Sequence, residues 1–370
     1  MPKAAKKVAV GISGGVDSSV AAYLLKQQGY EVVGVFMKNF DPLFFFDEEM
    51  LTSNPELKTG CHWQTDQEDA RSVCQKLGIP FFIWNFEDDY YREVMDYFFQ
   101  EYRHGRTPNP DIMCNKKIKF GVFLNKAKQE LGVDYIATGH YARIDQRGGK
   151  FFLLKGADKN KDQSYFLYTL SQSVLPQVLF PVGALTKDEV RELARQIDLP
   201  TKNKKDSQGI CFVGEVDMRK FLLANLTPQP GQIIDWDTGE VIGEHQGLFL
   251  YTIGQRRGIG QGGAGIPYYV AGKDVKYNIL YVVKGAHHPK LFKQELVAVD
   301  LHWVTGEPDF SSDLAAKIRY RQSDQLCRVE KLAKNKVKVV FQKPQRAVTP
   351  GQSIVFYKND VCLGGGVIVE

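Results

Sequence analysis

The sequence predicts an α/β fold with a doubly wound parallel sheet, followed by a small central domain and a C-terminal β-barrel. In the first part of the chain, short apolar and β-branched runs alternate with amphipathic helical patterns, as in parallel strands joined by helices. From about residue 214 the pattern changes to strands punctuated by proline and glycine, and from about residue 289 to short alternating strands typical of a small barrel. We therefore expect domains at 1–213, 214–288 and 289–370.

The composition is that of an ordinary soluble globular protein. The chain has 370 residues, of which 43% are hydrophobic and 25% charged, and is long enough for two or three separate cores. No apolar run is long enough to cross a membrane, and the short basic start leads directly into the first predicted strand. We therefore expect a cytoplasmic protein without membrane contact, in a compartment that keeps thiols reduced.

Cysteine spacing and charge narrow the function classes. None of the six cysteines forms a C-x-x-C pair, so neither a zinc ribbon nor an iron–sulfur cluster is indicated, and no protein metal site is predicted. The formal charge is +5, and most of the excess lies after residue 289. With the basic clusters at 116–119 and 202–205, it suggests surfaces that face a polyanion, although each cluster fits a solvated charged face equally well.

The most informative stretch is 8–25, where an apolar run ends in Ser13, Gly14 and Gly15 and a helical pattern begins at once. Glycines allow close approach of a ligand, and the amides at a helix start form an anion site. The spacing matches neither G-x-x-x-x-G-K-[ST] nor G-x-G-x-x-G. A loop with hydroxyls and amides but no lysine suits the pyrophosphate of a nucleotide whose α-phosphate is attacked. The alternative is an ordinary strand–helix turn, which the whole S-G-G-V-D-S-S string disfavours.

Periodicity predicts the remaining helices and strands of the chain. Ligands of such a sheet bind at the carboxyl ends of its strands, where Gly14, Met37 and Gly139 fall. The capping pattern of Thr186 and Glu189 starts another helix. The predicted strands are 31–37, 79–86, 134–140 and, in the central domain, 243–251; the predicted helices are 65–77, 88–103, 116–131, one opening at 161–163, and 218–226; a hairpin is expected at 141–155.

A second stretch, 105–119, combines a stiff loop with a thiol. Two prolines disfavour helix before Ile112, and Asp111 and Cys114 stand three positions apart where a helix could begin, so both could face one site. A thiol at a helix start beside Lys116 and Lys117 is expected to have a lowered pKa, and Asp111 could act as general acid or base. The alternative for Cys114 is a small buried hydrophobic residue.

Two further segments carry reactive or unusual side chains. Cys211 lies in a basic, flexible stretch at the expected domain boundary, and two such cysteines beside a nucleotide loop suggest sulfur transfer. Residues 40–62 hold three adjacent phenylalanines, 44–46, which fit a lid or partner patch but are better explained by packing against the core. The Cys61–His62 pair has no second pair at metal-ligand spacing.

The long motifs resemble the tRNA-specific 2-thiouridylases, a family of PP-loop ATP pyrophosphatases that thiolates the wobble uridine of certain tRNAs. The resemblance covers nearly the whole chain and rests on S-G-G-V-D-S-S, M-K-N, G-R-T-P-N-P-D-x-x-C-N, A-T-G-H-Y-A, K-D-Q-S-Y-F-L, S-Q-G-I-C-F and G-Q-R-x-G. It implies an N-terminal adenylation domain, with the central domain and the barrel helping to hold tRNA. Segment 40–62 departs from the family pattern, being longer and more aromatic than the short acidic loop expected there.

The resemblance also implies roles for individual residues. Cys211 is expected to carry a persulfide, and Cys114 to release sulfide from this persulfide or to assist the transfer of its outer sulfur. The two cysteines are then left as a Cys114–Cys211 disulfide. Asp111 is the third expected catalytic residue. The cofactor is ATP with Mg²⁺, and the sulfur comes from a donor protein, a cysteine desulfurase or relay protein. Expected ATP contacts are Gly11, Ile12, Ser13, Gly14, Gly15, Val16, Asp17, Ser18, Met37 and Gly139; target-base contacts are Asn109, Pro110 and Asp111; tRNA contacts are His140, Lys161, Asp162, Gln163, Arg319, Tyr320 and Gln352.

Some alternatives stay open at the level of sequence. A lysidine-synthetase-type ligase would modify tRNA without the two cysteines, a cluster-dependent thiolase would need a C-x-x-C motif, and an RNA-binding protein with an inactive nucleotide domain would not consume ATP. Asp162 fits a structural cap as well as a tRNA contact. Neither the identity of the donor nor the choice between free sulfide and direct persulfide transfer can be read from the residues.

Overall fold

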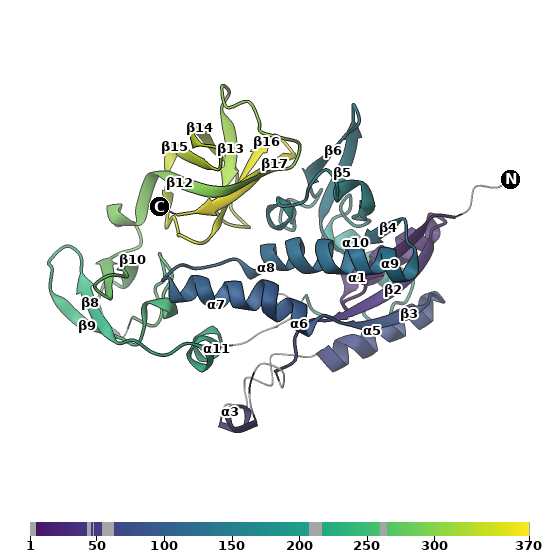
Figure 1. Cartoon of the computed structure of the whole chain (residues 1–370), viewed down its shortest axis with the longest axis horizontal. Coiled ribbons are helices and arrows are strands. Elements are labelled where there is room, and N and C mark those ends of the chain that lie inside the picture. The colour runs from purple at the N-terminus through teal and green to yellow at the C-terminus, as the bar shows by residue number, and fades with distance from the viewer. Residues whose placement is uncertain are drawn as a thin grey trace.

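The structure, a computed structural model, describes residues 5–42, 46, 48–53, 63–206, 217–259 and 265–369 (Figure 1). The predictions made for Phe44, Phe45, Cys61, His62 and Cys211 lie outside these described residues. Within them, no helix is long and apolar enough to cross a membrane.

The N-terminal domain is built on a five-stranded, all-parallel sheet in the order β3-β2-β1-β4-β7. Strands β2 and β3 lie on one side of β1, whereas β4 and β7 lie on the other, so a topological switch point falls between β1 and β4. Ligands of open α/β sheets bind at such a switch point. The prediction of a parallel α/β domain is confirmed. The strands are β1 Lys7–Gly11, β2 Glu31–Lys38, β3 Phe81–Asn85, β4 Tyr135–Ala137 and β7 Val178–Leu179.

Helices cover both faces of this sheet, and alternate residues of β1 point to opposite sides to meet them. Val8 and Val10 pack with helices α1 (Val16–Gln27), α5 (Trp63–Leu77) and α10 (Lys187–Gln196). Ala9 packs on the other face, against the two helices rich in aromatic residues that are described next. Helix α10 starts with the predicted capping box, in which Thr186 and Glu189 bond reciprocally.

Two long helices that lie side by side (Figure 1) cover the second face. Each contains a π-helical stretch. One runs from α6 (Glu87–Tyr90) through π-helical Tyr91–Met95 to α7 (Asp96–Arg103). The other runs from α8 (Pro110–Met113) through π-helical Cys114–Val122 to α9 (Phe123–Leu131).

The second of these helices begins earlier than the sequence predicted. Helix was disfavoured before Ile112, but the structure starts it at Pro110, with the side chain of Asn109 accepting from the Ile112 amide at 3.4 Å. A proline at the first helical position loses no hydrogen bond, since that amide has no partner within the helix, and its fixed φ suits the turn.

The C-terminal barrel is closed by six strands, β12-β15-β14-β13-β16-β17, with β12 pairing back to β17. The predicted hairpin of the N-terminal domain, β5 and β6, extends the same sheet, because Leu153 and Leu154 pair with Cys362 and Val361 of β17. This join between distant parts of the chain was not predicted. The bounds are β5 Ala142–Arg147, β6 Lys150–Lys155, β12 Phe292–Trp303, β13 Leu314–Lys317, β14 Gln325–Ala333, β15 Lys336–Arg346, β16 Ser353–Lys358 and β17 Val361–Ile368.

The central domain is a four-stranded sheet in the order β10-β11-β8-β9, preceded by α11 (Met218–Asn225). The strand predicted at 243–251 is wrong in its second half: β9 ends at His245, and Leu248–Leu250 form a 3₁₀ turn. The helix predicted to open at 161–163 is instead a single 3₁₀ turn, Ser164–Leu167. The strands are β8 Gly231–Asp235, β9 Val241–His245, β10 Tyr268–Asp274 and β11 Ile279–Lys284.

Helix α11 also packs on the N-terminal domain through Phe221, which is fully buried. The Phe221 ring meets Phe46 edge-on at 5.7 Å and stacks on Phe99 at 5.8 Å. Phe46 is the described member of the three adjacent phenylalanines, and it is packed in the core as the sequence favoured. Short helix α3 (Glu48–Ser53) follows it.

Candidate active site

The loop after β1 is shaped to receive an anion at the start of α1. The N-cap residue is Gly15, and no side chain caps the first turn. Uncapped amides at a helix start can receive an anion. Gly14 has φ +74°, and a Cβ there would lie 2.3 Å from the carbonyl oxygen of Asp66. The hydroxyl of Ser18 accepts from the Ser13 amide at 3.2 Å and holds the turn closed.

The ends of two neighbouring strands press against this loop. A Cβ on Gly139, just after β4, would lie 2.6 Å from the Ser18 amide nitrogen, and a Cβ on Gly11 would lie 2.9 Å from Cε of Met37. The structure therefore brings Met37 and Gly139 to the loop, at the switch point between β1 and β4. Backbone amides, hydroxyls and close-packed glycines fit the phosphate end of ATP. No cluster of three or more metal-ligating side chains occurs among the described residues.

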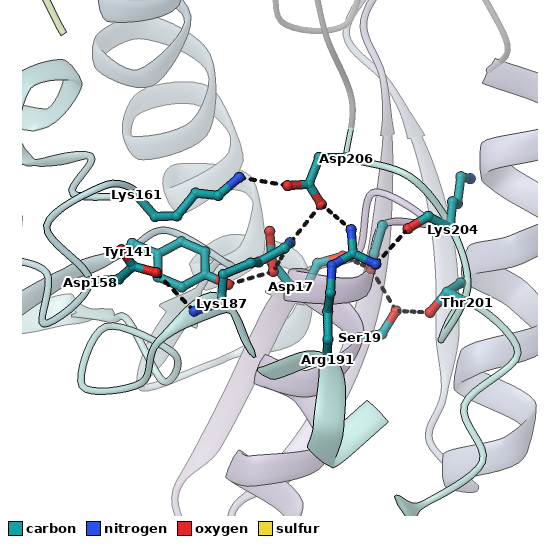
Figure 2. A network of polar contacts seen from close by, with 12 residues as sticks. Asp17, Ser19, Tyr141, Asp158, Lys161, Lys187, Arg191, Thr201, Lys204 and Asp206 are labelled. Atoms are coloured by element: carbon teal, nitrogen blue, oxygen red, sulfur yellow. Dashed lines mark hydrogen bonds and ion pairs between the residues drawn. The ribbon is translucent and has the colours of Figure 1, made fainter. Parts of the chain in front are cut away.

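Asp17, in the first turn of α1, is held by two donors that the sequence did not suggest (Figure 2). Its Oδ1 accepts from the Tyr141 hydroxyl at 2.8 Å and from Lys187 Nζ at 2.7 Å. Burial raises the pKa of Tyr141, and the Asp17 carboxylate raises it further, so the phenol stays protonated. Because Tyr141 follows β4 and Lys187 opens α10, no local pattern could have linked them to Asp17.

The same lysine reaches a second carboxylate, Asp206. Lys187 Nζ lies 2.8 Å from Asp206, and Lys161 Nζ and an Arg191 nitrogen each lie 2.6 Å from it. Burial alone would raise the pKa of Asp206, but Lys161 and Lys187 outweigh it and hold the pKa far below its ordinary value. Asp206 is therefore ionised at every physiological pH.

The helix that carries Asp111 and Cys114 packs beside the nucleotide loop. Phe120 lies 5.8 Å from the ring of His140, just after β4, and Phe123 Cε1 would lie 3.8 Å from a Cβ on Gly11. Asp111 is partly exposed, whereas Cys114 has no exposed surface and belongs to the apolar core. Lys117, expected to activate the thiol, forms an ion pair with Glu93 at 2.8 Å.

The residues expected to contact tRNA near β4 are engaged within the protein. His140 is buried, bonds to Thr138 through Nδ1 at 2.7 Å, and has its pKa lowered well below the ordinary value by burial and by Lys119. Asp162 accepts from the amides of Gly156 and Ser164, each at 3.1 Å, so it has a structural role, although Gln163 is the N-cap of the 3₁₀ turn. Gln163 accepts from the Tyr141 amide at 3.0 Å.

The expected tRNA contacts from the C-terminal barrel lie at its junction with the N-terminal domain. Tyr320 donates to the carbonyl of Lys161 at 3.2 Å, and Arg319 donates to the carbonyl of Ala347 at 2.7 Å. Gln352 donates to the carbonyls of Thr107 and Pro108, beside the expected target-base residues.

The basic cluster at 202–205 is partly neutralised. Lys204 pairs with Asp66 and Asp69 of α5, and Lys202 pairs with Asp198. These two lysines therefore offer less positive charge to a polyanion than the sequence suggested.

Fold and site together define a PP-loop ATP pyrophosphatase-type protein with two accessory domains. Residues 6–215 match the family described as tRNA methyl transferase HUP domain, 219–284 the tRNA methyl transferase PRC-barrel domain, and 293–368 the aminomethyltransferase beta-barrel domain.

Similarity to curated proteins extends over the full length. The chain is 51% identical to the tRNA-specific 2-thiouridylase MnmA of Geobacillus thermodenitrificans, covering 98% of this chain and 95% of that protein. It is 52% identical to that of Proteus mirabilis (98% and 97% covered) and 49% identical to that of Bacillus subtilis (98% and 94%). The chain belongs to the tRNA-specific 2-thiouridylases, a family of sulfurtransferase enzymes.

Proposed function

We propose that this protein is an ATP-dependent tRNA 2-thiouridylase that replaces the C2 oxygen of the wobble uridine with sulfur. One observation carries the proposal: the helix with Asp111 and Cys114 packs against the same strand ends as the phosphate-shaped loop, with Phe123 beside Gly11 and Phe120 on His140. This packing supports a nucleotide site and a thiol on neighbouring elements, as adenylation followed by sulfur transfer requires.

The first chemical step activates the base. The uracil C2 oxygen attacks the α-phosphorus of ATP, a P–O bond forms, and pyrophosphate leaves. Residues 11–18 hold the phosphates, and Met37 and Gly139 lie against the nucleoside. Activation is needed because an unmodified C2 carbonyl has no competent leaving group. Mg²⁺ bound with ATP would supply positive charge to neutralise the phosphates.

Base recognition falls to the loop before α8. Asn109, Pro110 and Asp111 receive the uridine, which must turn out of the anticodon stack at a cost of about a few kcal/mol, least where the base is already single-stranded. Asp111 is partly exposed at the helix start, in a place where it can exchange a proton with the bound base.

The second step transfers sulfur by one of two balanced routes. In one, Cys114 attacks the inner sulfur of a Cys211 persulfide, releases sulfide and forms the Cys114–Cys211 disulfide; the sulfide then attacks C2 and AMP leaves. In the other, the outer persulfide sulfur attacks C2 and AMP leaves, after which Cys114 attacks Cys211 and frees the thiolated base. Both routes end in 2-thiouridine, AMP and a disulfide, so a thiol reductant must regenerate the enzyme. Since Cys114 is buried, both also require that its surroundings open.

The partners follow from the same reaction. Domains 1–213, 214–288 and 289–370 together hold the tRNA, and a cysteine desulfurase or relay protein loads the persulfide. His140, Lys161, Asp162, Gln163, Arg319, Tyr320 and Gln352 are the proposed tRNA contacts. Since several of them bond within the protein, these contacts would form as the tRNA rearranges the junction.

The proposal is tested by incubating the protein with MgATP, a cysteine desulfurase with cysteine as the persulfide donor, a thiol reductant and unmodified tRNA that has a wobble uridine, then digesting the tRNA and analysing its nucleosides by mass. We expect 2-thiouridine, lost with Cys211→Ser and Cys114→Ser and kept with Cys327→Ala, a buried barrel cysteine. Production of AMP and pyrophosphate without a thiolated base, and unaltered by either serine variant, would leave an adenylating ligase and overturn the sulfur chemistry.

A further inference from the structure

Three cations from two separate segments of the chain converge on one carboxylate beside the loop that follows β1 (Figure 2). Lys187 and Arg191 come from the first turns of α10, and Lys161 comes from the segment after β6. All three meet Asp206 at 2.6 to 2.8 Å. Like charges this close repel one another unless an anion lies between them, so Asp206 is what keeps them together.

The cluster is joined to the phosphate cradle by Lys187. Its side chain is 10% exposed, and its ammonium lies between Asp206 at 2.8 Å and Asp17 at 2.7 Å. Asp17 lies in the first turn of α1, next to the amides that would receive phosphate. A carboxylate beside a bound polyanion is unfavourable unless cations neutralise it, so Lys187 serves the nucleotide site as well as Asp206.

We propose that Asp206 is an internal counter-ion of the nucleotide site: its carboxylate holds Lys161, Lys187 and Arg191 in the nucleotide-free protein, and the phosphates of MgATP take these cations over. The inference rests on the proposed function only in taking MgATP as the ligand. Phosphate oxygens carry more charge and more acceptor positions than one carboxylate, so they can replace it for several donors at once. Asp206 then competes with ATP, and its removal strengthens binding.

The segment that bears Asp206 has a second, separate attachment that supplies a control. Lys204 pairs with Asp66 and Asp69 of α5, and neither carboxylate contacts Lys187. Replacing the Lys204 side chain cuts only these two ion pairs and leaves the bond from Arg191 to the Lys204 carbonyl and the three ion pairs of Asp206 in place. An effect of Asp206 through charge can thereby be separated from an effect through anchoring.

The experiment measures the dissociation constants of MgATP and of adenosine by calorimetry without tRNA. We expect Asp206→Asn to bind MgATP roughly 3- to 10-fold more tightly, because the carboxylate that competes with the phosphates for the three cations is lost. The affinity for adenosine should stay unchanged. Lys187→Met is expected to weaken MgATP binding roughly tenfold, and Lys204→Met to leave it unaltered. Opposite signs for the Asp206 and Lys187 variants are the signature of a displaced counter-ion.

Unchanged or weaker MgATP binding by Asp206→Asn would overturn the inference, as would an equal strengthening by Lys204→Met, which would point to a loosened segment. Either result leaves the proposed function intact if the wild type still makes 2-thiouridine. Conversely, tighter MgATP binding by Asp206→Asn in a protein that makes no 2-thiouridine would uphold the counter-ion and remove the thiolase function.

Discussion

The side-chain amide of Gln352 donates to the carbonyl oxygen of Thr107 at 2.9 Å, which ties the C-terminal barrel to the loop just before the expected target-base residues. The amide of Thr107 in turn donates to the carbonyl of Pro350 at 3.0 Å. A Cβ on Gly351, where φ is +91°, would lie 2.9 Å from both the nitrogen and the oxygen of Thr107. The barrel therefore fixes the backbone of this loop directly, so that tRNA bound to the barrel as proposed would act on the expected target-base residues.

Replacing Gln352 with alanine removes two hydrogen bonds to the loop, those to Thr107 and Pro108. We expect kcat/KM for tRNA to fall about tenfold, as for the loss of one to two net hydrogen bonds, with the dissociation constant of MgATP unchanged. Thiolation kinetics at varied tRNA concentration measure kcat/KM, and calorimetry measures the dissociation constant of MgATP. Gln342→Ala, an exposed glutamine on the same barrel, is the control; an equal loss there would mean that the effect is not specific to the junction.

Glycine at position 139 is required by backbone contact with the nucleotide loop. A Cβ there would lie 2.6 Å from the Ser18 nitrogen and 2.7 Å from the Asp17 carbonyl carbon, and backbone cannot yield as a flexible side chain does. We therefore expect Gly139→Ala to weaken MgATP binding by tenfold or more. Gly243→Ala, whose nearest neighbour is 3.9 Å away, should bind MgATP normally. Normal binding by Gly139→Ala would show that the loop does not receive the phosphates.

Much of the N-terminal domain could be predicted because its signals are local. The apolar runs of β1 and β2, the capping pair of Thr186 and Glu189, and the S-G-G-V-D-S-S turn each lie within a few residues. The spacing of Asp111 and Cys114 likewise placed both at one helix start, which the structure confirms for the backbone.

The remaining features depend on contacts between distant parts of the chain. Lys187 meets Asp17 across 170 positions, and Leu153 pairs with Cys362, so no local pattern announces either contact. Burial of Cys114 likewise depends on the packing of a whole apolar core. Charge patterns were misleading for the same reason, since Lys204 counts as basic in the sequence and is paired with two aspartates in the fold.

Burial of Cys114 predicts protection from alkylation. The thiol has no exposed surface, so iodoacetamide should modify it at least about tenfold more slowly than in the unfolded chain. If catalysis opens its surroundings, MgATP and tRNA together should raise the rate at Cys114. Peptide mass analysis after timed alkylation gives the rate at each cysteine.

Cys362 supplies the control for this experiment, because it is equally buried but belongs to the barrel sheet and to no proposed step. Its rate should stay low in both states. Parallel acceleration of Cys114 and Cys362 would indicate general loosening, and no acceleration of Cys114 would contradict an opening on the reaction path.

Lys273 of β10 joins the central domain to the same loop as Gln352, since its Nζ donates to the carbonyl of Gly105 at 2.9 Å. Burial lowers the pKa of Lys273 to about 7. In the unfolded chain this lysine has its ordinary pKa of about 10.4. Between pH values of about 7 and about 10.4 the unfolded chain therefore binds more protons than the folded protein. Because stability rises with pH wherever the unfolded state holds more protons, this lysine favours folding increasingly from about pH 7 upward.

Comparison of the wild type with Lys273→Met isolates this contribution. The free energy of unfolding of the wild type, relative to the variant, should rise by about 1–2 kcal/mol between pH 7 and pH 9, allowing for partial exposure of the side chain. Urea unfolding of both proteins at matched pH values measures it. Lys276→Met, at an exposed lysine of the same domain, should show no such slope. A flat difference for Lys273→Met would mean that its ammonium is solvated and does not hold the Gly105 carbonyl from a buried position.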